Sequence, residues 1–329
     1  IDTVARKALK QGIGPFTAMN LTGGNPITNH GLDVSHEKLN TWYRSPDLMK
    51  QAMESGKPWD VAGRGEKVEL PADGEKRITD CLRGAYFGLV AQIIDSGISN
   101  ISDLEMALEV ALDIDPPFAM MNDMGVTNAL ELVRAYANTH PDFPVPDCLV
   151  KQAESGKPWP IEHVQRHDVG DVAVLRIRRP KVLNALNNVV FGQLEQHIQD
   201  IRDDEHVRGA VLTGFGVKAF VSGADIHFLA KIEGVQGGID TTEESKKAGN
   251  LIESLTKPVI CAMNGLAMGG GIELAMCCSA ILCKKGLKVA AAQPEVNLGI
   301  IPGAGGTQRL PRWIGVKKAA ELLRTGRPI

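Results

Sequence analysis

Three segments in the second half of the chain combine carboxylates, glycines and unpaired backbone donors. In residues 218–226 a predicted strand runs into a tight Ser-Gly-Ala-Asp turn, which can leave the amide of Ala224 without a partner. Residues 269–271 are glycines directly before a predicted helix that carries Glu273, and a second carboxylate, Glu295, precedes another glycine-rich helix start. Glycines let the backbone approach a ligand closely, and the first amides of a helix lie free at its positive end. The segments supply donors that can hold a ligand and two carboxylates, a residue type that moves protons in general acid–base catalysis.

Each segment has an ordinary explanation when it is taken alone. A triple-glycine turn is usually a tight corner, and a single glutamate is usually a solvated side chain. The Gly-Ala-Gly-Gly-Thr run at 303–307 could pass for a phosphate loop, but it lacks the following lysine and the strand–loop–helix spacing of that motif. The three segments together, in this order, are far more specific than any one of them.

The elements that must position these segments alternate between strand and helix. Strands are predicted at 172–177, 209–213 and 258–263, and helices at 188–201 and from about Gly270. This alternation is typical of an α/β layer structure. A stretch rich in proline and polar residues, 140–171, comes before it and is expected to hold one short helix. We therefore place a domain boundary near 160–170.

The first half contains an internal repeat. A Pro-Asp pair followed by Glu-Ser-Gly-Lys-Pro-Trp occurs at 46–59 and again at 146–159. A Pro-Phe segment that ends in Met-Asn, at 15–20, recurs at 117–122. Two matches in the same order and at nearly the same offset indicate duplication of one unit of about 100 residues.

Each repeat is predicted to be helical. One predicted helical face carries Ile78, Leu82, Ala85, Leu89 and Ile93. Ser102 is predicted to cap the next helix, with Glu105 completing a capping box. Trp59 and Trp159 end the repeated segments, and we expect them to anchor helices rather than to contact a ligand.

The first half resembles the C-terminal helical domain of 3-hydroxyacyl-CoA dehydrogenases, present in two copies. The resemblance is carried by the Gly-Pro-Phe run at 14–16, by Pro-Phe at 117–118 and by the helix starts that come before them. It places the first copy, incomplete at its N-terminus, at residues 1–62 and the second at 63–162. In that family an NAD-binding Rossmann domain with the catalytic His and Glu lies N-terminal to this region. The resemblance therefore implies substrate-side and subunit contacts, and no hydride transfer by this chain alone.

Residues 163–329 resemble the crotonase superfamily of enoyl-CoA hydratases and isomerases. The resemblance is carried by Asn-Ala-Leu-Asn at 184–187, by the Ser-Gly-Ala-Asp turn, by the Gly-Gly-Gly-Ile-Glu turn and by residues 293–312, from Gln-Pro-Glu to Leu-Pro-Arg. It implies the ββα superhelix of that family, incomplete at its C-terminus. The expected fold class is an α+β multidomain chain, in which an all-α helical repeat precedes an α/β crotonase domain, and we expect the chain to be a fragment lacking both ends.

The crotonase resemblance implies a role for each residue of the three segments. Adding water to an α,β-unsaturated thioester places negative charge on the thioester oxygen, and the amides of Ala224 and Gly270 are implied to hold it. Glu273 is implied to be the base that activates the water, and Glu295 to deliver a proton to Cα. Close carboxylates repel, so one of them should have a raised pKa that keeps a proton available. Gly303 is implied to help polarise the substrate or the water.

Coenzyme A is expected along the strand and turn of residues 219–226. The expected substrate contacts are Ala219, Ser222, Gly223, Asp225, Ile226, His227 and Gly303. His227 occupies a position where many family members carry lysine, which puts a contact with the CoA phosphates in doubt. Arg178, Arg179 and Lys181 are equally compatible with phosphate contacts and with a solvated strand end.

The predicted function is that of an enoyl-CoA hydratase, which forms 3-hydroxyacyl-CoA as part of a bifunctional hydratase and 3-hydroxyacyl-CoA dehydrogenase in fatty-acid β-oxidation or related acyl-CoA metabolism. Two alternatives stay open. One is another crotonase reaction, such as enoyl-CoA isomerisation, and the other is a non-catalytic CoA-binding and assembly fragment. The presence of both carboxylates favours the hydratase, because family members that only shift double bonds often lack the one at Glu273.

The composition of the chain limits the kinds of partner that we expect it to bind. The net charge of −3 gives no overall attraction to nucleic acid or to an anionic membrane. No apolar run approaches the roughly 20 residues of a membrane span. None of the six cysteines forms a metal-binding pair, so we expect reduced thiols in a cytoplasmic protein. We expect an acyl-CoA substrate, no metal, no tightly bound cofactor, NAD only in the missing Rossmann domain, and a homo-oligomer.

Overall fold

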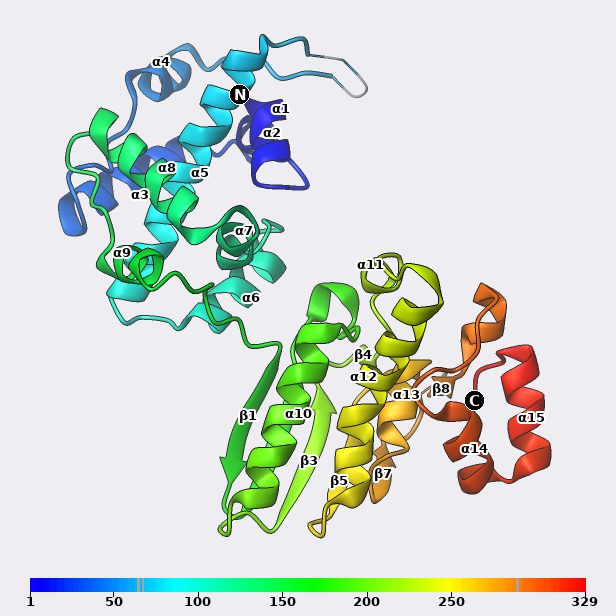
Figure 1. Ribbon diagram of the computed structural model, residues 1–329. Helices are drawn as coiled ribbons and strands as arrows, with labels where there is room; N and C mark the ends of the chain where they lie inside the picture. The colour runs from blue at the N-terminus through cyan, green and yellow to red at the C-terminus, as the bar shows by residue number, and fades with distance from the viewer. Residues whose placement is uncertain (64–65, 67, 288–289) are drawn as a thin grey trace. The chain divides into compact units, whose positions relative to one another are not determined.

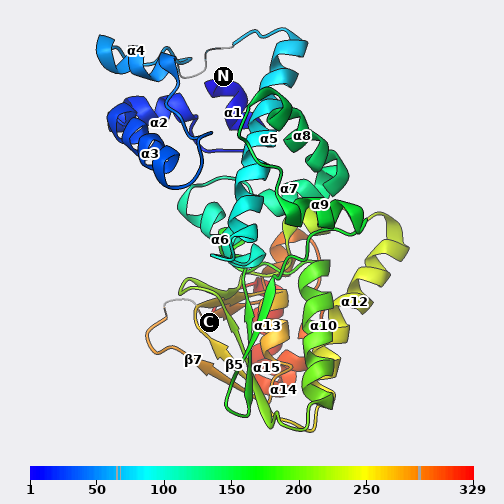
Figure 2. The ribbon, with the colours of Figure 1, turned by 90° about the vertical axis from the view of Figure 1, so that its left-hand side faces the viewer.

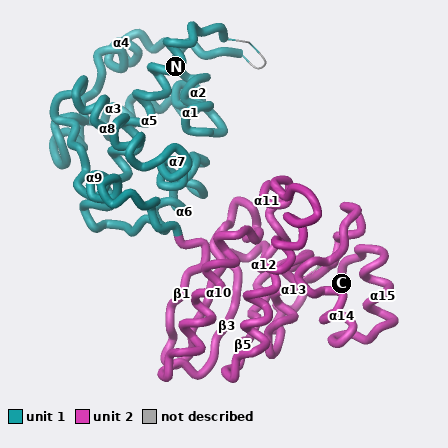
Figure 3. The backbone as a smooth tube through the Cα atoms, viewed as in Figure 1, with its two compact units in different colours: residues 1–161 teal, residues 162–329 magenta. Residues whose placement is uncertain are grey.

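The computed structural model of this protein describes residues 1–63, 66, 68–287 and 290–329. The chain divides into two compact units, unit 1 at Ile1–Ile161 and unit 2 at Glu162–Ile329 (Figure 3). Within the described residues every regular element of unit 1 is a helix, whereas unit 2 combines strands and helices (Figure 1). None of the described helices is both long and apolar enough to cross a membrane.

The core of unit 1 lies around a pair of contacting helices. The helices of this unit are α1 (Asp2–Ala8), α2 (Pro15–Thr22), α3 (Asn25–Lys38), α4 (Asp47–Ser55), α5 (Ala72–Asp95), α6 (Ile101–Ala111), α7 (Pro117–Met124), α8 (Val126–Thr139) and α9 (Asp147–Glu154). Helices α5 and α8 lie side by side (Figures 1 and 2). Phe87 and Val90 of α5 and Ala129 and Val133 of α8 belong to one buried cluster, so apolar burial between these two helices holds the unit together.

Helix α5 contains the helical stripe predicted for residues 78–93, but another of its faces is the buried one. The predicted apolar residues are only half-buried, whereas Gly84, Phe87, Gly88, Val90 and Ala91 are buried. A Cβ atom on Gly84 would lie 2.6 Å from the carbonyl oxygen of Leu132, and one on Gly88 would lie 2.5 Å from the ring of Phe143. The two glycines allow a close approach, and this decides which face is covered.

The predicted capping box at the start of α6 is wrong. The helix begins two residues earlier than the prediction requires, at Ile101, and its N-cap is Asn100, whose side chain accepts a hydrogen bond from the amide of Asp103. Glu105 does not complete the cap, because its Oε1 accepts a hydrogen bond from the amide of Ala119, at 2.7 Å. Asparagine is as good an N-cap as serine, and a tertiary acceptor role for Glu105 is not visible in the local pattern.

The two repeated segments carry matching polar contacts. Asn20 of α2 accepts a hydrogen bond from the amide of Trp59 and donates one to its carbonyl oxygen, both at 2.8 Å. Asn122 of α7 makes the same two bonds with Trp159, at 2.7 and 3.0 Å. Each tryptophan therefore anchors the end of its segment to a helix, as the sequence predicts.

A carboxylate also holds the first amides of the helix in each segment. Asp2 accepts hydrogen bonds from the amides of Phe16 and Thr17 in α2, at 2.8 and 3.1 Å. Glu105 does this for α7 through Ala119. Burial raises the pKa of Glu105 to about 7, although the α7 amides oppose the rise. A negative side chain at the positive end of a helix stabilises it.

Replacing Glu105 by alanine is expected to lower the free energy of unfolding by roughly 1–3 kcal/mol, because the first amides of α7 lose their acceptor. Urea unfolding of the two proteins measures the difference. Glu131 on α8 is exposed, and Glu131→Ala serves as the control, with an expected change within about 0.5 kcal/mol. Equal effects of the two substitutions would contradict the role of Glu105.

Unit 2 contains two sheets. Its elements are β1 (Val164–Val169), β2 (Val172–Ile177), η1 (Pro180–Val182), α10 (Asn188–Asp203), β3 (Gly209–Gly214), β4 (Ala219–Val221), α11 (Ile226–Leu229), α12 (Gly234–Ser254), β5 (Val259–Met263), β6 (Leu266–Met268), α13 (Gly270–Ala275), β7 (Ala280–Cys283), β8 (Ala291–Ala292), η2 (Pro294–Leu298), α14 (Gly306–Ile314) and α15 (Val316–Thr325). The larger sheet has the order β1-β2-β3-β5-β7, and the smaller has the order β4-β6-β8. Only β1 runs antiparallel to its neighbour; the other described strand pairs are parallel.

Consecutive strands of unit 2 alternate between the two sheets. Strands β3, β5 and β7 lie in the larger sheet, and the strand that follows each of them lies in the smaller one. A helical segment follows each such pair, which gives a repeating ββα pattern. Helices α10 and α12 pack against each other, and α10 also contacts β1 and β2 (Figure 1). The alternation of strands and helices predicted from the sequence is therefore confirmed.

Most predicted elements of unit 2 occur where the apolar runs place them. Strand β2 has the predicted bounds, and β3, β5, α10 and α13 begin within one residue of the prediction. The structure adds a strand that the sequence analysis does not predict. Strand β1 lies in the polar stretch where only a short helix was expected. It is an edge strand whose burial falls from Val164 to an exposed end, so its sequence lacks an apolar run.

Candidate active site

The triple-glycine corner before α13 is fixed by close backbone packing. Gly269 has φ 49° and ψ −122°, a conformation that favours glycine, and its amide donates to the carbonyl oxygen of Ala292 at 2.9 Å. A Cβ atom on Gly271 would lie 2.3 Å from the carbonyl oxygen of Val221. Glycine at both positions therefore brings the start of α13 against β4 and the turn that follows it.

The turn after β4 leaves the amide of Ala224 free among the described residues. The amide of Ser222 donates to Leu183, the amide of Leu186 donates to Gly223, and the amide of Asp225 donates to Leu186, at 2.8–3.0 Å. The amide of Ala224 has no hydrogen-bond partner within the described part of the chain. The same holds, for the described residues, for the amide of Gly270, the first residue of α13.

The free amides and the first carboxylate face a common space. A Cβ atom on Gly270 would lie 3.9 Å from the amide nitrogen of Ala224 and 4.0 Å from Oε2 of Glu273. The side chain of Leu186 borders the same position, at 3.5 Å. The structure thus brings together Ala224, Gly270 and Glu273, three of the residues that the sequence singles out.

Glu273 is a buried carboxylate that accepts a hydrogen bond from the backbone. It is 2% exposed, and its Oε1 accepts a hydrogen bond from the amide of Gly306 at 2.7 Å. Burial is the main reason that its pKa is raised to about 7; the Gly306 amide lowers the pKa, and the charge of Glu295 raises it. The carboxyl group can therefore take up and release a proton near neutral pH.

Glu295 also lies beside the glycine corner. It is buried in η2, and a Cβ atom on Gly269 would lie 2.8 Å from its Oε1. Its Oε2 is buried and has no hydrogen-bond partner among the described residues. Burial raises the pKa of this carboxyl, partly offset by its own backbone amide. The two predicted carboxylates thus flank the same corner, and one of their oxygens is available to a further donor.

Gln293 is a part of the site to which the sequence analysis gives no role. Its side chain is buried, and its Nε2 donates to the carbonyl oxygen of Gly269 at 3.2 Å. The Gly269 carbonyl and the Gly270 amide belong to one planar peptide group, so this bond orients the free amide. A Cβ atom on Gly306 would lie 2.5 Å from Oε1 of Gln293. The only signal in the sequence is its position two residues before Glu295.

Some of the predicted CoA contacts are exposed to solvent, and others are buried or hydrogen-bonded within unit 2. Ile226 is 76% exposed and His227 is exposed, whereas Ala219 is buried in β4 and Gly223 is buried in the turn. The hydroxyl of Ser222 donates to the carbonyl oxygen of Val182 at 3.1 Å. Gly303 is partly exposed and lies near Thr242 of α12.

Asp225 is occupied by internal partners. One oxygen forms an ion pair with Arg179 at 2.8 Å, and the other accepts a hydrogen bond from the amide of His227 at 2.9 Å, which caps α11. Burial acts to raise its pKa, but Arg179 and the His227 amide outweigh this effect and lower it. Arg179 also donates to the carbonyl oxygen of Ala185, so its guanidinium is likewise engaged inside the unit.

A cavity of about 470 Å³ lies beside this turn, at the starts of α10, α11 and α12. Its lining includes Asn187, Asp225, His227, Phe228, Lys231 and Asp240. The cavity thus reaches two of the predicted substrate contacts. No group of three or more His, Cys, Asp or Glu side chains in the described residues could hold a metal ion.

Comparisons with known proteins concern unit 2. The enoyl-CoA hydratase/isomerase family model matches residues 168–329. The chain is 45% identical over 154 residues to crotonyl-CoA hydratase of Syntrophomonas wolfei, a match that covers 47% of this chain and 58% of the relative. It is 43% identical over 163 residues to short-chain-enoyl-CoA hydratase of Clostridium acetobutylicum, with 49% and 60% covered. It is 35% identical over 168 residues to fatty acid oxidation complex subunit alpha of Shewanella halifaxensis, with 51% and 24% covered.

The chain spans about three fifths of the length of the first two of these relatives. The matched region begins inside β1 and runs to the last residue, so it contains the glycine corner, the turn with the free amide and both buried carboxylates. Residues 168–329 therefore form an enoyl-CoA hydratase/isomerase domain of the crotonase superfamily.

Proposed function

We propose that unit 2 catalyses the reversible addition of water to a 2-enoyl-CoA thioester, which gives a 3-hydroxyacyl-CoA. One observation carries the proposal: two unpaired amides and two buried carboxylates surround the same glycine corner. An enolate forms transiently on the thioester oxygen in this reaction, and a proton must leave the water while another reaches Cα. The corner offers a group for each of these tasks.

The amides of Ala224 and Gly270 hold the thioester oxygen. Both are fixed by backbone packing before substrate arrives, so they stabilise the developing charge without reorganising. One such donor is typically worth about 3 kcal/mol of the activation barrier. The Gln293 side chain supports this geometry, since it orients the peptide group that contains the Gly270 amide.

Glu273 activates the water and Glu295 delivers the proton to Cα. The Gly306 amide donates to Glu273, which favours the ionised form of this carboxyl. Oε2 of Glu295 is buried and lacks a partner among the described residues, so ionisation is less favourable there. We therefore assign the proton of the pair to Glu295 when the substrate binds.

The pH dependence of the reaction follows from this shared proton. Burial raises the pKa of Glu273 to about 7 and also raises that of Glu295. Protonation of both groups removes the base, and ionisation of both removes the acid. We expect a bell-shaped dependence of kcat/KM on pH, with an acidic limb near pH 7 where Glu273 becomes protonated and an alkaline limb where Glu295 loses its proton. Initial rates with crotonyl-CoA measure it, and a flat profile would contradict the shared-proton assignment.

Hydration of crotonyl-CoA tests the proposed function directly. The ultraviolet absorbance of the conjugated thioester should fall when the protein is added, and 3-hydroxybutyryl-CoA should form. Conversion of a 3-enoyl-CoA to the conjugated thioester, without hydration, would favour the isomerase. Tight CoA binding with no turnover would favour a non-catalytic binding and assembly module. The names of the first two relatives, both hydratases, support the hydratase.

The repeat in unit 1 is consistent with a second activity in the same protein, one that acts on the product of hydration. We propose that residues 1–62 and 63–162 are two copies of a dehydrogenase C-terminal-like helical domain, and the matching asparagine–tryptophan contacts support this. The product of hydration is a 3-hydroxyacyl-CoA, the substrate that an NAD-dependent dehydrogenase would oxidise. Similarity to a fatty acid oxidation complex subunit alpha is consistent with such a pairing. The homo-oligomer and the cytoplasmic location stay predictions.

A further inference from the structure

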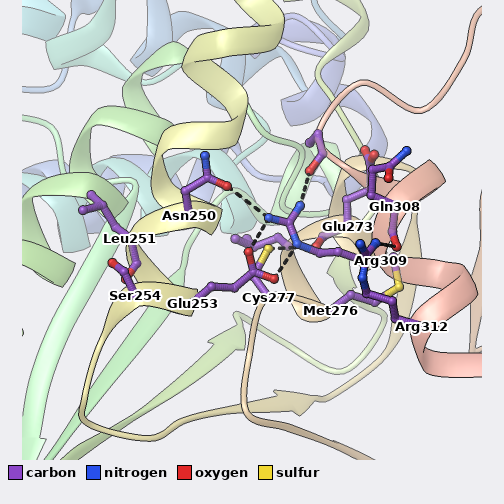
Figure 4. A network of polar contacts seen from close by, with 12 residues as sticks. Asn250, Leu251, Glu253, Ser254, Glu273, Met276, Cys277, Gln308, Arg309 and Arg312 are labelled. Atoms are coloured by element: carbon purple, nitrogen blue, oxygen red, sulfur yellow. Dashed lines mark hydrogen bonds and ion pairs between the residues drawn. The ribbon is translucent and has the colours of Figure 1, made fainter.

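Arg309 of α14 joins two elements of unit 2 through its guanidinium group (Figure 4). Its Nε and Nη2 donate to the two carboxylate oxygens of Glu253 on α12, both at 2.7 Å. Nη2 also donates to Oδ1 of Asn250, at 3.1 Å. The Arg309 side chain is only 12% exposed, whereas the Glu253 side chain is 45% exposed, so the two-pronged ion pair joins a shielded guanidinium to a partly solvated carboxylate.

The other side of the guanidinium lies against the glycine-rich turn before α14. Its Nη1 donates to the carbonyl oxygen of Ala304 at 2.8 Å. A Cβ atom on Gly305, where φ is 107°, would lie 2.0 Å from the same nitrogen. The backbone of this turn therefore packs directly on the charged group, and any larger residue at Gly305 would displace it.

The next residue in this turn is the one that contacts the catalytic base. The amide of Gly306 donates to Oε1 of Glu273 at 2.7 Å. A continuous series of contacts thus runs from α12 through Arg309 to residues 304–306 and on to Glu273. The sequence gives no sign of it, because Glu253 and Arg309 are 56 residues apart.

We propose that Arg309 is a positioning residue of the hydratase site. By fixing residues 304–306 to α12, it holds the Gly306 amide where it orients the carboxylate of Glu273. This inference rests on the proposed function and adds to it a residue that positions the catalytic base. Arg309 touches neither Glu273 nor the free amides in any hydrogen bond of the described residues, so its effect is transmitted through the backbone of the turn.

The positive charge of Arg309 and its contacts with the turn both lower the pKa of Glu273. Among the described residues, the titratable groups that face Glu273 are Glu295 from η2, Arg309 from α14 and Cys277, which lies two residues beyond the end of α13. Among these, Arg309 lowers the pKa of Glu273 and Glu295 raises it. Loss of the guanidinium would release the Gly306 amide and remove a positive charge, and both changes raise the pKa of Glu273 further.

Two substitutions separate the effect of the hydrogen bonds of Arg309 from the effect of its charge. Arg309→Gln removes both, and we expect kcat to fall roughly 10- to 100-fold with KM nearly unchanged, and the acidic limb of the pH profile, which reports the base Glu273, to move to higher pH. Arg309→Lys keeps the charge but cannot bridge Glu253, Asn250 and Ala304 at once. We expect it to lower kcat to an intermediate value with a smaller shift of the limb. Arg312→Gln, on the same helix, is the matched control, because within the described part of the chain the Arg312 side chain donates a hydrogen bond only to the Gln308 carbonyl oxygen and none to residues 304–306.

The Glu273 carboxyl group supplies a readout that does not need turnover. Its ¹³C resonance, assigned by comparison with Glu273→Gln, is titrated by NMR in the wild-type chain and in folded Arg309→Gln. A rise of the pKa in Arg309→Gln, absent in Arg312→Gln, supports the inference. An unchanged titration would overturn it even if the wild-type protein hydrates crotonyl-CoA. Absence of hydration by the wild-type protein would overturn the proposed function, while the titration would still decide the role of Arg309.

Discussion

Glu273→Gln is expected to lower kcat for crotonyl-CoA hydration by about 10²–10⁴-fold, the usual contribution of a general base. Glutamine keeps the size of the side chain, and its amide oxygen can still accept the hydrogen bond that the Gly306 amide donates to Oε1. The substitution therefore removes proton transfer and little else. Steady-state rates give the loss, and an unchanged urea midpoint would show that it is not caused by unfolding.

Glu295→Gln should cause a comparable loss of kcat, with a different effect on stability. The buried carboxyl has a raised pKa and an oxygen without a partner among the described residues, so its ionised form is disfavoured in the folded state. A carboxyl whose folded pKa is raised stabilises the fold at low pH and loses that contribution as pH rises through the folded pKa. We therefore expect Glu295→Gln to be at least as stable as wild type at alkaline pH.

An exposed glutamate provides the control for both substitutions. Glu243 lies on α12 with its side chain in solvent, and Glu243→Gln should leave kcat and stability unchanged. Wild-type rates in Glu273→Gln or Glu295→Gln would exclude the two-carboxylate mechanism. Loss of activity in all three variants would point to damage unrelated to the site.

The parts of the site that sequence alone predicts are those that depend on local backbone. The apolar alternation of residues 172–177 is enough to define β2, and three glycines before Glu273 are enough to indicate a corner at a helix start. The free amide of Ala224 also follows from the turn sequence. These features need few distant neighbours, so residue type and spacing carry them.

The parts that sequence reasoning missed depend on tertiary neighbours. Gln293 acts through the Gly269 carbonyl, and Arg309 through Glu253, contacts that exist only after the sheets and helices have assembled. Asp225 is held by Arg179, 46 residues away, an ion pair that the sequence analysis does not foresee, and its contact with substrate stays a prediction. The buried face of α5 is decided in the same way, by glycines that admit α8.

Gly271→Ala is expected to damage both the fold and the reaction, because the space behind this residue is already filled. The new Cβ would lie 2.3 Å from the carbonyl oxygen of Val221 and 2.8 Å from its Cβ, so either β4 or the start of α13 must move. Overpacking of this kind typically costs about 1–3 kcal/mol of stability. Urea unfolding measures this loss.

The same displacement separates the two free amides. Val221 ends the strand that leads to Ala224, and Gly271 follows Gly270 directly, so moving α13 away from β4 opens the space between the two donors. Loss of one donor typically lowers kcat by about 10²–10³-fold, and we expect a decrease approaching this size in the folded fraction of Gly271→Ala. Gly192 of α10 has nothing within 4 Å of its Cβ position, so Gly192→Ala should be neutral or slightly stabilising and fully active. If Gly271→Ala were as stable and as active as Gly192→Ala, close packing of the corner against β4 could not be what sets the oxyanion-binding geometry.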